Sequence, residues 1–385
     1  MPAKFPDSIE LPPTADMHVH LRDGSMMRIC TPYIRSGGAD TAYIMPNLVP
    51  PITTVEAALA YKSRLHAIEP KVTFLMTLYL HPSLTPEIIA SAARAGIAGV
   101  KAYPAGVTTN SSAGVVDWKA FYPVFGAMEQ HNLVLNLHGE VPTPKPSEQA
   151  ARETPVNILT AESLFLPTLH QIHTAFPRLR IVLEHCTTAA ALDAVAGCGS
   201  CVAATITAHH LWITTDDVVG DVDNFCKPVA KSEHDRRALL KAAVGQYDPR
   251  LEGRIMFGSD SAPHAIDKKH VAPGQKSAAG CFTQPYTTQL VIGAVEQALA
   301  DGLLEGVSED KLIPALRAFL SENARRFYGL EGSTDTYKII LERKPGVGMM
   351  KAISKSEESD EVVSVFRGGM QTWSLRWAGM GEEIG

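Results

Sequence analysis

The sequence predicts an α/β protein built on one (β/α)₈, or TIM, barrel with a small C-terminal β appendage. Three observations carry this prediction. Eight short apolar runs follow one another along the chain, helical patterns lie between most of them, and most of the runs end in polar residues. Buried parallel strands are typically continuous apolar runs, and eight alternations of strand and helix are typical of the barrel.

The apolar runs are each four to eight residues long at their core and are rich in aliphatic or β-branched residues. They lie at residues 15–21, 41–47, 71–80, 97–104, 133–140, 179–186, 201–211 and 253–260. A doubly wound open sheet is the structural alternative. No G-x-G-x-x-G motif follows the first run, which weakens the dinucleotide-binding form of that alternative.

Helical patterns between the runs carry start and stop signals. Segment 53–68 begins with two threonines that can cap a helix, and its apolar residues recur at helical spacing. Segment 85–96 begins with Thr-Pro-Glu and ends at Gly96, which is a typical helix start and stop. Segments 187–197 and 232–245 show the same pattern and predict two further helices.

The alternation of strands and helices breaks down from about residue 330. We therefore expect residues 1–330 to form the catalytic barrel and residues 331–385 to form an extension packed on it. Three short strands are expected in this extension, around an exposed acidic turn at 354–361. These strands lie at 338–343, 361–369 and 372–379.

The composition is that of a globular protein and excludes several classes. Of 385 residues, 45% are hydrophobic and 20% charged, which excludes wholesale disorder. The formal charge is −6 and no long basic run is present, so we expect no nucleic-acid partner. No apolar stretch reaches 18 residues and no leader pattern is present, so we expect no membrane span or targeting peptide. Six cysteines predict free thiols and a cytoplasmic location.

Polar residues that can bind metal or transfer a proton end most of the apolar runs. Side chains at the carboxyl ends of barrel strands line one mouth, so we expect these residues to lie together. Polar groups in such positions are costly unless they are paired or bound. The residues are His18, His20, Arg22, Asn47, Lys101, His138, His185 and Asp260, with His264 four residues later.

This array predicts a metal centre. His18 and His20 are two residues apart on an extended strand, so their imidazoles point the same way; in isolation such a pair is as well explained by two structural histidines. The ammonium of Lys101 cannot ligate a cation. Lys101 therefore either binds an anionic group or is carbamylated by CO₂ to a carboxylate that bridges two ions. Nitrogen and oxygen ligands without thiolate fit zinc, with manganese or cobalt as alternatives.

A centre of two divalent ions indicates metal-assisted hydrolysis of an amide, ester or phosphoester. Two ions hold a hydroxide between them and lower the pKa of its parent water toward ~7. Asp260 can take the proton of the attacking hydroxide and pass it to a leaving nitrogen. Arg22, Asn47 and His264 remain after the ions are ligated, and together they suit a substrate carboxylate.

Seven segments, in order along the chain, resemble dihydroorotase, and more narrowly the shorter homodimeric class found in bacteria and fungi. They are residues 18–24, 45–54, 101–112, 136–140, 184–188, 203–211 and 258–264. The resemblance covers about residues 14–330, and the longer tail beyond it is of the fungal kind. The wider amidohydrolase superfamily would share only the H-x-H pair, the lysine, two further histidines and the aspartate.

The resemblance implies a binuclear zinc centre at the mouth of a TIM barrel, with Asp260 as general acid/base and Lys101 as N6-carboxylysine. One zinc would be held by His18, His20, Lys101 and Asp260, and the other by Lys101, His138 and His185.

The resemblance also implies how the substrate is held. Arg22, Asn47 and His264 would bind its carboxylate, and the backbone of Ala279 would contact its ring. Thr108 and Thr109, in a mobile loop, would close over it. Two departures from the bacterial pattern stand nearby: Lys227 replaces a leucine, and Pro142 removes a side-chain contact.

The implied reaction is the interconversion of N-carbamoyl-L-aspartate and (S)-dihydroorotate in pyrimidine synthesis, by a cytoplasmic homodimer. Two alternatives stay open. Another cyclic amidase, such as a hydantoinase or allantoinase, would share the metals without needing Arg22 and Asn47 as a carboxylate clamp. An inactive barrel that serves as a binding subunit would be free to lose its ligands, whereas all six ligand positions are filled here.

Overall fold

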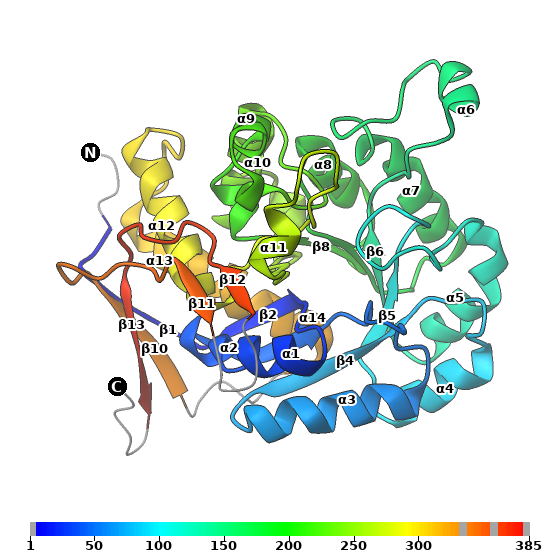
Figure 1. Ribbon diagram of the computed structural model, residues 1–385, viewed down its shortest axis with the longest axis horizontal. Coiled ribbons are helices and arrows are strands. Elements are labelled where there is room, and N and C mark those ends of the chain that lie inside the picture. The colour runs from blue at the N-terminus through cyan, green and yellow to red at the C-terminus, as the bar shows by residue number, and fades with distance from the viewer. Residues whose placement is uncertain (1–4, 331–336, 355–360, 380–385) are drawn as a thin grey trace.

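The computed structural model describes residues 5–330, 337–354 and 361–379. Its centre is an eight-stranded parallel sheet, in chain order, that closes almost completely into a barrel (Figure 1). The strands are β2 (Thr14–Val19), β3 (Ala39–Ile44), β4 (Thr73–Tyr79), β5 (Gly99–Ala102), β6 (Val134–His138), β7 (Ile181–Glu184), β8 (Val202–Ile206) and β9 (Ile255–Phe257). Each coincides with one predicted apolar run, so the predicted barrel is confirmed.

The first and last barrel strands meet just beyond their regular hydrogen-bonded ladders. Val19 and Ser261 form an isolated parallel bridge. The Asp260 amide donates to the His18 carbonyl at 2.8 Å, and the His20 amide donates to the Ser261 carbonyl at 3.0 Å. These bonds close the barrel at its carboxyl end and bring residues from both ends of the barrel sequence together.

Helices surround the barrel (Figure 1). Thr54 and Thr85 cap α3 and α4, as the sequence predicts, by accepting hydrogen bonds from the amides three residues later. The α-helices are α1 (Gly24–Cys30), α2 (Tyr33–Ser36), α3 (Val55–Ile68), α4 (Pro86–Arg94), α5 (Tyr122–Gln130), α6 (Pro146–Ala150), α7 (Leu166–Ala175), α8 (Ala189–Gly197), α9 (Thr215–Gly220), α10 (Glu233–Ala243), α11 (Ile266–Lys269), α12 (Thr287–Ala300), α13 (Glu309–Arg317) and α14 (Asn323–Tyr328).

Short 3₁₀ helices and one π-helix complete the helical elements among the described residues. The 3₁₀ helices are η1 (Trp118–Phe121), η2 (Ser163–Phe165), η3 (His209–Leu211), η4 (Val222–Asn224), η5 (Pro249–Leu251) and η6 (Gln284–Tyr286), and the π-helix is η7 (Ala318–Glu322). Helix η3 shortens one predicted strand, because the apolar run at 201–211 leaves the sheet after Ile206.

The barrel interior changes from apolar to polar along β6. On β6, Val134 belongs to a buried apolar cluster, whereas Asn136 accepts a hydrogen bond from the Tyr43 hydroxyl at 2.6 Å. Two residues further on, His138 lines the cavity at the mouth. Because alternate residues of a strand face the same side, this order places chemistry at the carboxyl end and packing below it.

The C-terminal residues form strands beside the barrel, and a strand from the start of the chain joins them (Figure 1). One sheet has the order β1 (Ser8–Leu11), β10 (Tyr337–Glu342) and β13 (Ser374–Gly379), all antiparallel. A separate pair joins β11 (Ala352–Ser354) to β12 (Val362–Ser364). The sequence pattern indicates β10, β12 and β13 but not β1 or β11. Most of the predicted acidic turn lies outside the described residues, and the domain division at residue 330 stays a prediction.

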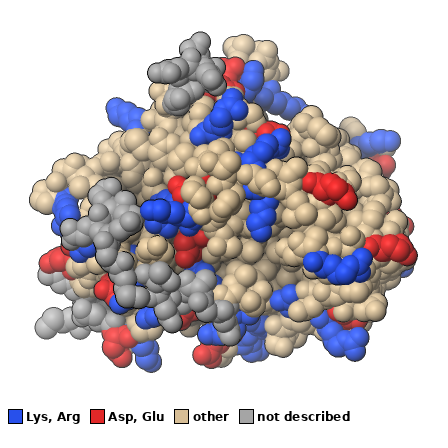
Figure 2. All heavy atoms as spheres, turned by 90° about the horizontal axis from the view of Figure 1, so that it is seen from below, with Lys and Arg blue, Asp and Glu red and all other residues tan. Residues whose placement is uncertain are grey.

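On the face shown in Figure 2, basic and acidic side chains are interspersed. No helix among the described residues combines the length and apolar character that a bilayer span requires. All six cysteines are unpaired, as expected for free thiols.

Replacing Arg325 with methionine is expected to lower the free energy of unfolding by about 3–5 kcal/mol. The Arg325 side chain is only 3% exposed and binds Asp40 Oδ1 at 2.5 Å and the Pro13 carbonyl at 3.2 Å. Methionine would leave the Asp40 carboxylate, which is 14% exposed, without its cation. Denaturant titration of the full chain measures the loss.

Arg317 provides the matched control, because its side chain is 56% exposed while it pairs with Glu322 at 2.6 Å. Arg317→Met is expected to lower the free energy of unfolding by at most about 1 kcal/mol, because exposed ion pairs contribute no more than that. Equal costs for the two variants would show that the Arg325 contacts do not stabilise the barrel.

Candidate active site

The polar residues predicted from the strand ends converge at one mouth of the barrel. They surround a small cavity. Its lining includes His18, His20, Arg22, Asn47, Thr108, Thr109, His138, His185, Asp260 and Ala279, together with Tyr103, Lys227, Ala262 and Gly280. Lys101 and His264 are not part of the lining, but both lie directly beside it and are described below.

Asp260 lies against two imidazoles from β2 and its extension. His20 Nε2 is 3.1 Å and His18 Nε2 is 3.5 Å from Asp260 Oδ1, and potential ligand atoms of all three residues lie within 4.8 Å of one another. His18 Nδ1 lies 2.9 Å from Glu184 Oε2. When Nδ1 donates to Glu184, the Nε2 lone pair of His18 faces Asp260. Acceptor atoms that face one another in this way suit a cation between them.

Lys101, His138 and His185 complete the predicted ligand set. The His138 and His185 rings are 4.6 Å apart, and the His185 and His18 rings 5.0 Å, between centroids. Lys101 is completely buried in β5, and neither its Nζ nor His185 Nδ1 has a hydrogen-bond partner. Buried polar atoms without partners are rare and point to a bound group or a modification.

Two buried carboxylates orient the imidazoles, and the sequence pattern did not single them out. Glu184 binds His18 and also accepts hydrogen bonds from Asn136 at 2.7 Å and Thr205 at 2.6 Å. Glu140 Oε2 lies 2.8 Å from His138 Nε2. Carboxylates that hold ligating imidazoles are common around metal sites. Both lie inside the motifs NLHGE and EHC, one or two residues from a predicted ligand, and that position was the available signal.

The backbone is strained at three of the predicted residues. Arg22, His185 and Asp260 have φ values of 62°, 41° and 46°, in the left-handed region. Each such residue costs about 1–3 kcal/mol and persists where the surrounding structure holds it, which is typical of functional sites. All three follow barrel strands, so the turn that leaves the strand aims each side chain at the mouth.

Arg22 and His264, two of the three residues predicted to bind a substrate carboxylate, lie in contact at one side of the cavity. Arg22 Nη2 lies 3.0 Å from His264 Nε2, which also lies 2.9 Å from the Ala279 carbonyl. Burial, together with the positive charge of Arg22, lowers the pKa of His264 to about 3. His264 is therefore neutral, and Arg22 supplies the positive charge on this side of the cavity.

A loop after β5 covers the cavity and is held by polar contacts. Asn47 Nδ2 donates to the Thr109 carbonyl at 3.1 Å, and Lys227 Nζ donates to the Val107 carbonyl at 2.9 Å. The Thr108 amide donates to Ser111 Oγ at 2.9 Å. Lys227, noted as a departure from the bacterial pattern, therefore reaches this loop.

An eight-stranded barrel with imidazoles, a carboxylate and a buried lysine at its carboxyl mouth defines an amidohydrolase-type protein. A family model described as amidohydrolase matches residues 15–330. The chain is similar to a probable dihydroorotase of Schizosaccharomyces pombe, with 45% identity over 88% of this chain and 91% of the relative. The chain belongs to the amidohydrolase family and, within it, to the dihydroorotases of the fungal kind.

Two solved structures extend the comparison. The crystal structure of dihydroorotase in complex with 5-fluoroorotic acid from Saccharomyces cerevisiae matches with a TM-score of 0.85 and 42% identity, over 97% of this chain and all of that one. An L-hydantoinase (dihydropyrimidinase) from Arthrobacter aurescens matches over 97% of this chain and 84% of that one, with a TM-score of 0.73 and 18% identity, which shows a shared fold alone.

Proposed function

We propose that this chain catalyses the reversible cyclisation of N-carbamoyl-L-aspartate to (S)-dihydroorotate and water, in pyrimidine synthesis. One observation carries the proposal: the Arg22 guanidinium, in contact with His264, borders the same small cavity as the imidazoles around Asp260. Family membership supports it, because the two similar proteins above 40% identity are named a probable dihydroorotase and a dihydroorotase. A cytoplasmic homodimer stays a prediction from the same resemblance.

The residues at the mouth fit two divalent cations, for which zinc is proposed. Unpartnered Lys101 Nζ and His185 Nδ1, and the His18 and His20 nitrogens that face Asp260, are the observations that support the fit. One ion would be held by His18, His20, Lys101 and Asp260, and the other by Lys101, His138 and His185. When bound, such a pair supplies a deprotonated water as nucleophile and polarises a carbonyl.

Lys101 is proposed to be carboxylated on Nζ. A carbamate forms when an unprotonated amine attacks CO₂. Burial lowers the pKa of Lys101 to about 8, against the opposing influence of Glu184 and Asp260. A larger share of the amine is therefore neutral near physiological pH than for an exposed lysine. The product is an anion in place of a cation, which suits a position among metal ligands.

Asp260 is proposed as general acid/base. Burial alone would raise the pKa of Asp260, but His18, His20 and Lys101 hold it at about 2. The carboxylate is therefore ionised at neutral pH and able to accept a proton. In the hydrolytic direction it takes the proton of the nucleophile and delivers it to the departing ring nitrogen. Cyclisation follows the same path in reverse.

Arg22, Asn47 and His264 are proposed to hold the substrate carboxylate, and the Ala279 backbone its ring. Thr108 and Thr109 are proposed to close over the substrate from the loop after β5. A covering loop excludes water from the reacting carbonyl and keeps the substrate in place.

Replacing Arg22 with methionine is expected to raise KM for dihydroorotate about 10- to 100-fold, the range for a lost charge-assisted hydrogen bond. Wild-type enzyme should turn over dihydroorotate far faster than dihydrouracil, which lacks the carboxylate, and the variant should narrow that preference. Steady-state assays with both substrates and with a 5-substituted hydantoin test the proposed function against the hydantoinase alternative.

Arg178→Met is the control for Arg22→Met, because the Arg178 side chain is 84% exposed and pairs with Glu129 at 3.3 Å. Its kinetics should match the wild type. Preference for the uncharged hydantoin by the wild-type enzyme would reject dihydroorotase as the function, and an unchanged KM in Arg22→Met would remove Arg22 from substrate binding.

Metal is expected to stay bound when the pH falls below the ordinary histidine pKa of about 6.5. Burial lowers the pKa of His18 and of His185 well below that value. A lowered pKa means that protons compete with metal only at a lower pH. Dialysis across a pH series, followed by elemental analysis, measures retention. Loss of metal centred near pH 6.5 would contradict this expectation.

A further inference from the structure

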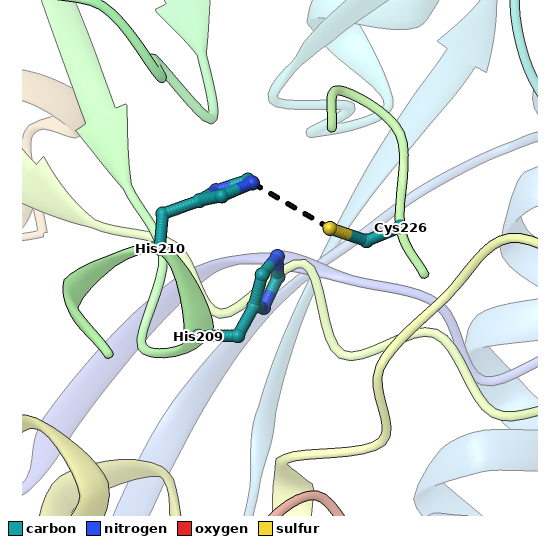
Figure 3. Close-up of side chains that lie close together, drawn as sticks. All are labelled: His209, His210 and Cys226. Atoms are coloured by element: carbon teal, nitrogen blue, oxygen red, sulfur yellow. Dashed lines mark hydrogen bonds between the residues drawn. The ribbon is translucent and has the colours of Figure 1, made fainter. Parts of the chain in front are cut away.

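A second cluster of potential ligands lies outside the candidate catalytic set. His209 and His210 stand in η3, directly after β8, and Cys226 stands in the segment that follows η4. Potential ligand atoms of these three side chains lie within 4.8 Å of one another. Figure 3 shows Cys226 facing the two imidazoles from the neighbouring segment. The exposed fraction of each residue is 1% or less.

Hydrogen bonding accounts for only part of this cluster. His210 Nδ1 lies 2.8 Å from Thr207 Oγ1, and its Nε2 lies 3.0 Å from the Pro228 carbonyl. Cys226 Sγ can donate to the same carbonyl at 3.3 Å. His209 has no hydrogen-bond partner on either ring nitrogen, although its ring is completely buried. Burying an unsatisfied polar group costs about 1–3 kcal/mol, so His209 needs a partner of another kind.

The spacing of the cluster matches that of ligands on one metal ion. His210 Nε2 and Cys226 Sγ are 3.6 Å apart. An imidazole nitrogen about 2.0–2.1 Å and a thiolate sulfur about 2.3 Å from a tetrahedral zinc ion are about 3.6 Å from each other. When the Nδ1 proton of His210 is directed at Thr207, Nε2 has no proton to donate to the Pro228 carbonyl 3.0 Å away, and both atoms can then face one ion. Two imidazoles and a thiolate favour zinc-class ions over magnesium or calcium.

We propose that His209, His210 and Cys226 form a third metal site, distinct from the candidate catalytic pair, that takes Zn²⁺ or a similar thiophilic divalent ion. Binding displaces the thiol proton of Cys226 into solvent and leaves a thiolate–metal bond. A water molecule or the Pro228 carbonyl would take the remaining position.

Such an ion would cross-link the segment that contains Cys226 to the residues that follow β8. The next residue, Lys227, lines the catalytic cavity and holds the Val107 carbonyl of the covering loop. The third site would therefore have a structural role, which is to fix the wall from which Lys227 reaches the loop. This role does not depend on the identity of the substrate.

The third site would contain a thiolate and the proposed catalytic centre contains none, so spectroscopy can distinguish a metal ion bound at one from a metal ion bound at the other. The full chain, produced in cobalt-supplemented medium and kept in a phosphine reductant, is expected to show a near-ultraviolet thiolate-to-cobalt charge-transfer band. The band should correspond to one thiolate-bound ion per chain, and Cys226→Ser should abolish it. His209→Gln should reduce retention of this ion at least tenfold in competition with a chelator.

The chain offers a matched control in its other cysteine–histidine contacts. Cys198 Sγ lies 3.6 Å from His170 Nδ1, and Cys201 Sγ lies 3.9 Å from His173 Nδ1. The double variant Cys198→Ser, Cys201→Ser should keep the band. A band that is lost in this control, or that survives in Cys226→Ser, would place the ion elsewhere and overturn the proposal.

X-ray absorption of the zinc-loaded wild type decides the question if Cys226→Ser fails to fold. One sulfur scatterer at about 2.3 Å, retained in the double variant, would support the third site. A zinc shell of nitrogen and oxygen alone would overturn it. Dihydroorotate turnover of the same wild-type sample is measured in parallel. Full turnover without a sulfur scatterer rejects only the third site. A sulfur scatterer without turnover of dihydroorotate rejects only the proposed function.

Discussion

Replacing Asp260 with asparagine is expected to lower turnover about 10²- to 10⁴-fold in both directions, the range for loss of a general acid/base. Asparagine keeps the volume and one ligating oxygen but cannot carry a proton between nucleophile and leaving nitrogen. Asp260 Oδ1 lies 3.1 Å from His20 Nε2 and 3.5 Å from His18 Nε2, so its carboxylate contacts both imidazoles.

The measurement pairs steady-state kcat with elemental analysis, because loss of metal would also lower turnover. Metal content is expected to stay largely unchanged in Asp260→Asn. Asp267→Asn is the matched control, since Asp267 follows on α11 with a side chain 66% exposed and pairs only with Lys268. Turnover of Asp260→Asn within tenfold of the wild type would remove Asp260 from proton transfer.

Replacing Lys101 with alanine is expected to reduce activity to background and to lower metal content. The long side chain of Lys101 is completely buried, and its Nζ has no hydrogen-bond partner. If Nζ carries a carbamate that bridges two ions, alanine removes the bridge and leaves a cavity. A short-chain carboxylic acid such as acetate or propionate can enter that cavity and supply the missing carboxylate, so activity is expected to return with added acid.

Activity and metal content are therefore measured with increasing propionate. Lys227→Ala is the comparison variant, because Lys227 is the other lysine at this cavity and its Nζ is bonded to a backbone carbonyl. Any loss of activity in Lys227→Ala should not respond to carboxylic acids. Two bound ions per chain in Lys101→Ala without added acid would count against the carbamate. An intact mass of the native wild-type protein without the added CO₂ would also count against it.

Much of this site follows from residue patterns along single strands. The H-x-H pair at His18 and His20 predicts two imidazoles on one side of a strand, and apolar runs that end in Lys101 or His138 predict polar groups at one mouth. These inferences need only the twofold period of a strand and the direction shared by parallel strands. The geometry that brings the predicted residues together agrees with them, while their catalytic roles stay proposals.

Other features depend on contacts between segments far apart in the chain. Glu184 reaches His18 across 166 positions, and Lys227 reaches the Val107 carbonyl across 120. Strand β1 pairs with β10, which joins the first residues of the chain to its last part. No local period encodes such pairs, because each partner has the same local pattern whether or not the other is present.

The sequence by itself determined the eight-stranded barrel and the polar residues that end its strands, because hydrophobic periodicity and strand direction are local properties. Only the tertiary structure decided which nitrogen of each imidazole is held by a carboxylate and which faces a neighbour. It also decided that Lys101, His185 and His209 carry buried polar atoms without partners. Hydrogen-bond satisfaction is a property of the packed molecule, since it depends on every group that packing brings near a buried atom.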